Sequence, residues 1–454
     1  MNRRKFLQAS GLGVSALFNP IMASDNGNPL APKKTHHKAA AKACIVIFLE
    51  GGPGHMDTFD PKPVLDKLHL KTYKFTKFGN TKESYYVKSP FKFKKHGESG
   101  IPMSEHFVHL GDVADELCMY RGCQADSVNH PSALAHMNTG NKFSGDPGLG
   151  AWINYGLGSQ NPDLPGHIIM TETYYPQGGA NNWSNGYLPA VFQGTPLRSK
   201  GSPILDLTAP KSVTTQHQRD NLDLLSLLNK KHQAKHPQHK ELSARMNNYE
   251  LAFRMQGKVP SIIDIDKEPE HIKKMYGINN SGKDGFNRQC LLARRLVENG
   301  VRFVQVYSGG WDSHDYLERS HKARIQASDQ AIAALIKDLK QQGMLDETLV
   351  VCTGEFGRTP GNTKRGGGIA LGRDHNAEAM SMFFAGGGTK SGHIIGATDE
   401  IGAKAVEVVH PIRDVHCTIL HQLGLDDNKL TYFHGGRYKQ LSQIGGQVIK
   451  DLIA

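Results

Sequence analysis

The chain has 454 residues, of which 38% are hydrophobic, enough for a large core in one α/β domain with insertions or in two domains. Its formal net charge of +11 favours anionic partners. The six cysteines show no CxxC spacing, which argues against a disulfide framework, redox chemistry and structural zinc. We expect an anionic small molecule or a polysaccharide as partner, and no nucleic acid.

Residues 1–24 are predicted to be a cleavable export signal. Arg3 and Arg4 precede an apolar stretch that ends near the small residues Ala23 and Ser24, a pattern typical of the twin-arginine route for folded proteins. The alternative is an uncleaved anchor, but the stretch is short for a span and is interrupted by polar residues and glycines. We therefore expect a linker at 25–42 and a periplasmic or secreted mature chain that does not span the membrane.

The first predicted strand runs from Cys44 to Leu49 and breaks at Gly51 into a loop that carries Asp57. A basic edge insertion follows at 65–100, where residues 71–96 interleave eight lysines with seven aromatic residues and one acid. Lysines of this kind protect an exposed sheet edge from aggregation. They also form a rim that attracts an anionic polymer, and the pattern leaves both interpretations open.

A polar segment with helical spacing covers residues 214–277, and we interpret it as a helical insertion because no strand pattern accompanies it. Next come an amphipathic helix ending at Gly300, a strand from Val301 to Tyr307, a helix capped by Ser328, and a strand from Leu349 to Thr353.

This order predicts a right-handed parallel crossover, with the three strands as neighbours in the centre of one sheet. We therefore expect an α/β fold with three layers, a mainly parallel mixed sheet flanked by helices, in a single domain at 43–454. Asp312, His314 and Glu355 would then emerge at the same edge of the sheet, where ligands bind in open α/β sheets.

Ligand-type side chains gather in four loops that contain Asp57, "WDSH", "GEFGR" and "RDHN". One Asp-x-His in a loop is usually a turn or a cap, but four such loops at predicted sheet edges favour a divalent metal such as Zn, Mn, Ca or Mg. The predicted ligands are Asp57, Asp312, His314, Glu355, Asp374 and His375.

The ordered motifs "FLEGGPGHMDTFDPKP", "FKFKKHGESG", "SGGWDSHD", "TGEFGRTP" and "GRDHN" closely resemble the DUF1501 family. That family is abundant in planctomycete-like bacteria, is grouped with the alkaline phosphatase/sulfatase superfamily and has no settled substrate. The resemblance covers nearly the whole mature chain. It implies an alkaline phosphatase-like fold and an exported metal-dependent hydrolase.

Position by position, the resemblance implies an altered metal site. Superfamily members end the first strand in a metal-binding Asp, where this chain has Glu50. Where superfamily members have an Asp-His pair of metal ligands, this chain has Glu355 followed by Phe356, so the histidine ligand of that pair is replaced by a phenylalanine. Asp312 with His314, and the later His375, resemble the remaining ligands.

The nucleophile of the superfamily is the largest departure. The superfamily pattern implies a Cys, Ser or Thr nucleophile about nine residues before a Thr-Gly pair, and here His130 lies at that distance from Thr139. The chain also has no Cys-x-Pro-x-Arg motif, which a sulfatase needs to form its formylglycine. Three options remain: His130 as ligand or phospho-acceptor, Ser127 or Ser132 as nucleophile, or direct attack by water that the metal activates. The alternative is that His130 only caps a helix that begins at Pro131.

Arg358 and Arg373 lie on the flanking loops, and their planar guanidinium groups match phosphate or sulfate oxygens unless they form ion pairs within the protein. Two functions follow. The first is an exported metal-dependent hydrolase of phosphate or sulfate esters on anionic polysaccharide. The second is a non-catalytic protein of the same fold that binds such a polymer.

Overall fold

The computed structural model describes residues 29–77, 80–172, 175–198, 210, 212–236, 240–279, 282, 284–364, 368 and 370–454. The predicted twin-arginine signal at 1–24 lies outside the described residues, as do residues 25–28 of the predicted linker.

A mixed nine-stranded sheet forms the centre of the molecule. Its strands are β1 (Ala43–Leu49), β6 (Leu117–Gln124), β7 (His167–Thr171), β8 (Thr195–Leu197), β9 (Phe303–Ser308), β10 (Thr348–Thr353), β14 (Met380–Ala385), β15 (His393–Ile395) and β18 (His410–Pro411). The order is β15-β6-β14-β10-β1-β9-β7-β8, with β18 also paired to β6. Only β14 runs antiparallel to the other strands of this sheet.

The predicted neighbourhood of three central strands is confirmed. Strand β1 lies between β10 and β9 and is parallel to both, with Cys44 opposite Leu349 on one side and Phe303 on the other. Every residue of these three strands is buried, as expected for parallel strands that are covered on both faces.

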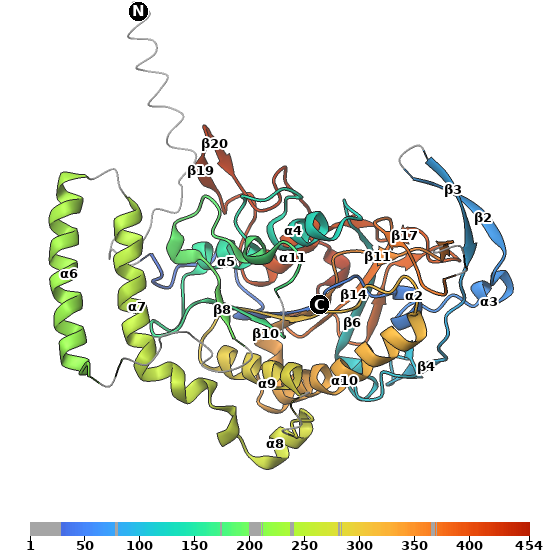
Figure 1. Ribbon diagram of the computed structural model, residues 1–454, viewed down its shortest axis with the longest axis horizontal. Coiled ribbons are helices and arrows are strands. Elements are labelled where there is room, and N and C mark those ends of the chain that lie inside the picture. The colour runs from blue at the N-terminus through green and yellow to red at the C-terminus, as the bar shows by residue number, and fades with distance from the viewer. Residues whose placement is uncertain are drawn as a thin grey trace, which may run out of the picture.

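Helices cover both faces of the sheet and give the three predicted layers (Figure 1). One layer holds α8 (Glu270–Met275), α9 (Gly285–Glu298) and α10 (Leu317–Gln341); the other holds α4 (His130–Thr139), α5 (Leu149–Leu157) and α11 (Ile412–Gln422). The fold class expected from the sequence, a mainly parallel mixed sheet flanked by helices, is therefore confirmed. All six cysteines are buried free thiols.

One helix boundary differs from the prediction. The helix expected to begin at Ser328 begins at Leu317, so the predicted cap lies inside α10. The Ser328 hydroxyl donates to the carbonyl oxygen of Arg324 at 2.9 Å, one turn earlier, which is how serine is accommodated within a helix.

The basic segment forms an extension at one end of the molecule (Figure 1). Strands β2 (Thr72–Lys77) and β3 (Asn80–Tyr86) form an antiparallel hairpin, and β12 (Gly361–Thr363) pairs with β3 as a third strand. Strand β4 (Phe93–His96) pairs with β5 (Ile101–Ser104). Through β12, the basic hairpin is hydrogen-bonded to the loop that follows β10.

Two long helices, α6 (Thr215–Lys235) and α7 (Lys240–Ile263), lie at the opposite end, within the segment expected to be helical. The short elements are α2 (His55–Thr58), α3 (Val64–Leu68), β11 (Gly357–Arg358), β13 (His375–Asn376), β16 (Ala397–Thr398), β17 (Ala405–Glu407), β19 (Tyr432–His434), β20 (Arg437–Lys439) and six 3-10 turns at Leu110–Glu116, Gly179–Trp183, Ala190–Phe192, Ile265–Lys267, Leu345–Glu347 and Lys450–Leu452. Within the described part of the chain, no helix has both the length and the apolar character needed to cross a membrane.

Candidate metal centre

The carboxyl ends of the central strands bring the polar loops together. Asp312 follows β9, and Glu355 follows β10, while His130 is the first residue of α4. His375 lies in β13, which pairs with β11 so that His375 is opposite Arg358. Parallel strands place their carboxyl ends at one edge, which explains why segments far apart in sequence meet here.

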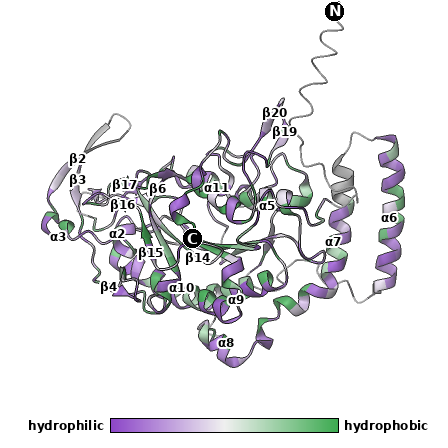
Figure 2. Ribbon diagram, turned by 180° about the vertical axis from the view of Figure 1, so that it is seen from behind, coloured by the Kyte–Doolittle hydropathy of each residue, from purple (hydrophilic) through white to green (hydrophobic). Residues whose placement is uncertain are grey.

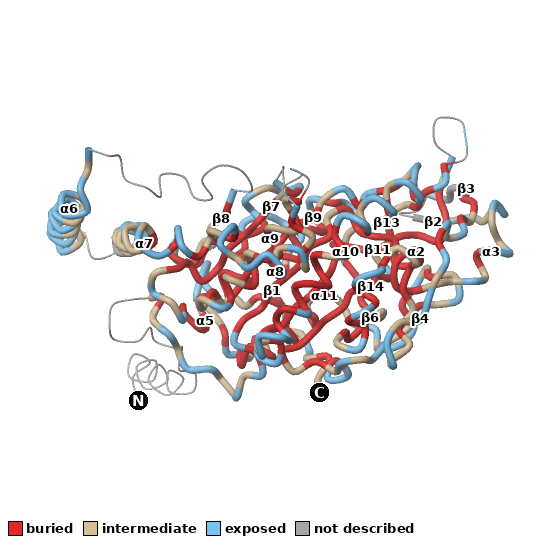
Figure 3. Tube along the Cα trace, turned by 90° about the horizontal axis from the view of Figure 1, so that it is seen from below, coloured by how far each residue is buried: buried red, intermediate tan, exposed pale blue. Residues whose placement is uncertain are grey.

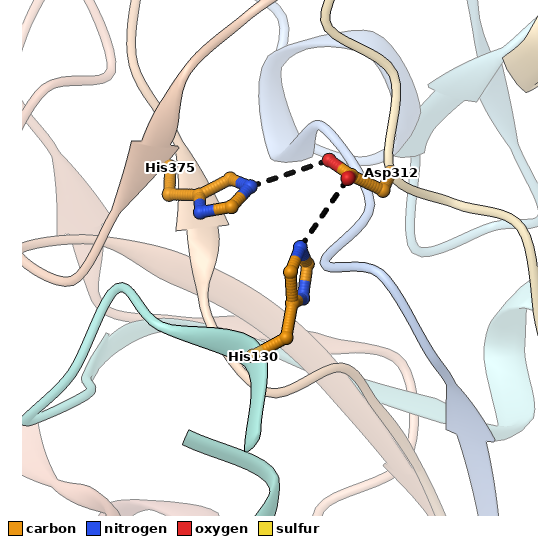
Figure 4. A group of neighbouring side chains, drawn as sticks. All are labelled: His130, Asp312 and His375. Carbon is orange, nitrogen blue, oxygen red and sulfur yellow. Dashed lines mark hydrogen bonds and ion pairs between the residues drawn. The ribbon is translucent and has the colours of Figure 1, made fainter. Parts of the chain in front are cut away.

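Three side chains form the centre of the cluster. One ligand-type atom from each of His130, Asp312 and His375 lies within 4.8 Å of the others (Figure 4). Nε2 of His130 is 3.4 Å from Asp312 Oδ2, and Nε2 of His375 is 3.3 Å from Asp312 Oδ1. The two imidazoles thus approach the same carboxylate from different sides.

His314 adds a fourth group. Its Nε2 lies 3.1 Å from Asp312 Oδ1 and 3.0 Å from Nε2 of His375. Bonds of about 2.0–2.1 Å in a tetrahedral zinc site place neighbouring ligand atoms about 3.3–3.4 Å apart. The separations of His314 and His375 from Asp312 are close to those edges, and His130, Asp312 and His375, with atoms within 4.8 Å of one another, could converge on one small divalent ion.

The opposite nitrogen of each imidazole is held by a hydrogen-bond acceptor. Nδ1 of His130 lies 2.6 Å from Glu355 Oε1, and Nδ1 of His314 lies 3.1 Å from Asp374 Oδ1. Nδ1 of His375 lies 2.7 Å from the carbonyl oxygen of Val128, which can only accept. A donating Nδ1 leaves the lone pair on Nε2, the arrangement that carboxylate and carbonyl partners impose on metal-ligating histidines.

Glu355 occupies a position behind His130. Its carboxylate is fully buried and accepts from the Gly51 N–H at 3.0 and 3.1 Å as well as from His130. Gly51 has a φ of +115°, and a Cβ there would lie 2.3 Å from the backbone nitrogen of Asp312. The structure therefore gives Glu355 the role of orienting His130, which differs from the expectation that it meets the ion directly.

The pKa values show strong coupling within the cluster. Burial lowers the pKa of His130, but its interactions with Asp312 and Glu355 outweigh burial and raise it to about 9. Burial likewise opposes ionisation of Asp312, yet the three imidazoles and Arg358 hold its pKa far below the usual range. Nε2 of His130 is buried and has no hydrogen-bond partner among the described residues. The donor set thus fits a cation.

Arg358 and Arg373, for which the sequence left open a role at substrate oxygens or an ion pair within the protein, are both buried. Arg358 donates to Gly52 O at 2.7 Å and to Asp312 Oδ1 at 2.6 Å, so it fixes the carboxylate of the cluster. Arg373 donates to both oxygens of Asp57 at 2.6 and 3.0 Å, and both side chains are fully buried. Asp57 is therefore paired with Arg373 rather than facing the cluster.

The start of α4 presents His130 without using it as a cap. Asn129 is the N-cap residue, and its side chain accepts from the Ser132 N–H at 3.3 Å, while Pro131 lies in the first turn. Ser127 Oγ accepts from the Asn129 N–H at 3.1 Å. The two serines thus support this turn, and the imidazole of His130 is left for the cluster.

A cavity of about 770 Å³ lies beside the cluster. It is bounded by Glu50, which follows β1, and by Gly309 and Gly310, which lead from β9 to Asp312. Arg319 and Arg324, on the first turns of α10, line it as well. Neither arginine is among the residues predicted from the sequence, although two arginines in the helix that follows "WDSHD" are a signal for an anion site.

Comparison with known proteins identifies a family. The family model described as "Protein of unknown function (DUF1501)" matches residues 41–453, and no curated protein matches the chain.

Similar solved structures include Ps i-CgsB in complex with k-i-k-neocarrahexaose, at 11% identity, coverage of 86% of this chain and 74% of that one, and a TM-score of 0.38. A protein in the alkaline phosphatase superfamily from Vibrio parahaemolyticus has 11% identity, coverage of 94% and 76%, and a TM-score of 0.37. The phosphonate monoester hydrolase SpPMH from Silicibacter pomeroyi has 11% identity, coverage of 85% and 73%, and a TM-score of 0.34. At scores below 0.5, no activity is inferred from them.

Proposed function

Because the chain belongs to the DUF1501 family and gathers three imidazoles and a carboxylate at one sheet edge, we propose that it is an exported metal-dependent hydrolase of phosphate or sulfate esters. One observation carries the proposal. The Nε2 atoms of His130, His314 and His375 converge on Asp312, and an acceptor behind each ring fixes its Nδ1.

The donor set narrows the choice of metal. His130, His314, His375 and Asp312 would hold one divalent ion, which when bound supplies a Lewis acid and positive charge next to the ester oxygens. Of the four candidate metals, zinc suits an imidazole-rich site best, whereas manganese, calcium and magnesium prefer oxygen ligands. We therefore favour zinc and keep manganese as the second candidate.

The surrounding residues keep this donor set in position. Glu355 and Asp374 orient two of the imidazoles, and Arg358 fixes the Asp312 carboxylate. Such partners commonly determine metal affinity and ligand direction. His130, whose Nδ1 is held by Glu355, would offer its Nε2 to the ion, so we assign it as a ligand rather than as a phospho-acceptor.

We propose that the cavity beside the cluster takes the part of the substrate that remains after ester cleavage. Arg324 donates to Gly309 O at 3.0 Å, and Arg319 lies over the Tyr316 ring at 4.7 Å. Both guanidinium groups line the cavity together with the carboxylates of Glu50 and Glu172, and Arg324 lies 4.0 Å from Glu172. Guanidinium groups suit a carboxylate, sulfate or phosphate on a sugar unit, and carboxylates accept hydrogen bonds from its hydroxyl groups. We therefore propose a polysaccharide that carries an anionic ester as the substrate.

The test measures metal and turnover on one preparation. The purified mature protein should contain about one zinc or manganese per chain and should hydrolyse 4-nitrophenyl phosphate or 4-nitrophenyl sulfate. Asp312→Asn should lose both properties while remaining folded by circular dichroism. Metal binding without turnover of either ester, or of sulfated and phosphorylated polysaccharides, would refute the hydrolase.

A second candidate function is binding of an anionic polymer without turnover. The basic extension supports it. Lys74 lies on β2, whose hairpin with β3 joins the loop of the proposed metal centre through β12, and Lys94 and Lys95 lie on β4, which pairs with β5. The exposed lysines are Lys71, Lys74, Lys88, Lys92, Lys94 and Lys95. Retention on a sulfated polymer by a protein inactive on every ester would favour this function.

We also propose export through the segment at 1–24. The paired Arg3 and Arg4 and the apolar stretch after them support this route. Replacing both arginines with lysine should leave the chain in the cytoplasm with its N-terminus uncleaved, as measured by cell fractionation and N-terminal sequencing. Export that is unaffected by this change would contradict the twin-arginine assignment.

A further inference from the structure

The helix α6 stands apart from the body of the protein (Figure 3). It has 21 residues, and none of them is buried, although a helix of about 31 Å normally gains its stability by packing an apolar face. It is attached to α7 by Arg219, which donates to both oxygens of Glu250 at 2.8 and 2.6 Å and lies over the Phe253 ring. One side of α6 therefore has a partner.

The side of α6 that faces away from α7 is apolar at its centre. Leu224, Leu227 and Leu228 are 56%, 51% and 53% exposed, and their spacing places them on one face. Figure 2 shows green, hydrophobic turns within the otherwise largely purple helix. The residues on the α7 side are half-buried instead, namely Arg219, Leu222, Leu225, Ser226 and Asn229. Three adjacent exposed leucines form a patch, unlike single exposed leucines, which are common.

Opposite charges flank this leucine patch along the helix. Asp220 precedes Leu224 by one turn, and Asp223 directly precedes it and forms an ion pair with Arg219 at 2.8 Å. Lys230 and Lys231 follow Leu227 and Leu228 by one turn. If two α6 helices pair antiparallel about a twofold axis midway between Leu224 and Leu228, the acidic end of each patch lies beside the basic end of the other. The aspartates of one helix then lie within one residue, or about 1.5 Å of helix rise, of the level of the lysines of the other helix.

We propose that α6 is a self-association surface through which two copies of this chain pair in an antiparallel, twofold arrangement. The leucine patch lies at the centre of the interface, and the Asp–Lys pairs on either side determine its register. Two faces about 31 Å long and about 10 Å wide bury roughly 600 Å² in total, which is below the area of about 1,000 Å² expected of a stable specific interface and indicates a weak, transient contact. The dimer is therefore reversible, and the hairpins of β2 and β3 lie at the ends of the two copies that are remote from α6.

The experiment follows the mass of the purified protein by sedimentation equilibrium. In a concentration series up to roughly 1 mM, the average mass of the wild type should rise from the monomer mass towards twice that mass. Leu224→Gln combined with Leu228→Gln should weaken association at least tenfold while circular dichroism remains unchanged. A wild type that stays monomeric at this concentration overturns the proposal.

Charge reversal tests the arrangement in variants that keep the ion pair between Arg219 and Asp223. A variant with Asp220→Lys should associate at least tenfold more weakly, and so should one with Lys231→Glu, because like charges then face each other. Mixing the two should restore dimers, since the lysine introduced at position 220 of one variant helix then faces the glutamate introduced at position 231 of the other. Mixing without dimers, or unweakened association in both single variants, overturns the antiparallel pairing.

Discussion

The role of Glu355 can be tested by the substitution Glu355→Gln. The buried carboxylate holds Nδ1 of His130 at 2.6 Å and accepts from Gly51, so it acts on the ion only through the imidazole. Glutamine keeps the shape and an acceptor oxygen but removes the negative charge. We expect weaker metal binding, not its loss.

The magnitude follows from the position of the carboxylate behind the ligand. Losing a partner of this kind typically lowers metal affinity by 10–100-fold, which corresponds to about 1.4–2.7 kcal/mol. Asp312→Ala removes a ligand outright, and we expect no measurable binding at micromolar metal. The two variants should therefore differ clearly in affinity.

The assay is competition for zinc against a chromophoric chelator, repeated with manganese. A matched control is Glu347→Gln, because Glu347 forms an exposed ion pair with Lys42 at 2.6 Å at the opposite edge of the sheet. This control should bind metal as the wild type does. Complete loss of binding in Glu355→Gln, equal to that in Asp312→Ala, would show that Glu355 is itself a ligand. Unchanged affinity would show that the hydrogen bond to His130 has no part in metal binding.

Three further predictions concern stability and surface charge. Asp57→Asn should lower the free energy of unfolding, measured in urea, by about 3–5 kcal/mol, because the charge of Arg373 is then buried and unpaired. If the variant instead keeps its stability and loses metal affinity, Asp57 is a metal ligand. Replacing the exposed Lys92, Lys94 and Lys95 by glutamine should lower the salt concentration needed to elute the protein from a sulfated-polymer column. Unchanged elution would show that these lysines only protect the sheet edge from aggregation. Lowering the pH from about 7 to about 5 should lower the free energy of unfolding by about 2 kcal/mol for each of three buried histidines. The reason is that burial lowers the pKa of each to about 4 in the folded protein, whereas in the unfolded chain it takes up a proton near the ordinary pKa of 6.5. In urea titrations at both pH values, each His→Gln variant should show a pH dependence of the unfolding free energy that is smaller by this amount, and a wild-type stability independent of pH would contradict the prediction. The histidines are His167, His321 and His416.

The sequence was sufficient to predict the centre of the fold. Continuous apolar runs in β1, β9 and β10 indicate strands that are buried on both faces, and the amphipathic helices between them restrict the connections to parallel crossovers. The same argument placed Asp312, His314 and Glu355 at one edge. These predictions depend only on periodicity and on the handedness of crossovers, which are local properties.

The roles of individual side chains could not be predicted in the same way. Sequence spacing does not show whether the oxygens of Glu355 face an ion or an imidazole, because that depends on a hydrogen bond to His130, 225 residues away. Arg358 lies in β11, a strand of two residues that is too short to produce a periodic pattern. Its burial, and that of Arg373 against Asp57, follow from pairing that only the folded chain shows.

The proposed metal centre also links distant parts of the chain. The hydrogen bond from Nδ1 of His375 to the carbonyl oxygen of Val128 closes a loop of 247 residues. Closing such a loop in an unfolded chain carries a large entropic cost, so the ligands are assembled only after β6, β9 and β14 have joined one sheet. An ion held there would therefore lower the free energy of the folded state alone and resist unfolding of the whole sheet. We propose that this protein leaves the cytoplasm already folded, so a metal bound before export would stabilise the folded state during transport across the membrane.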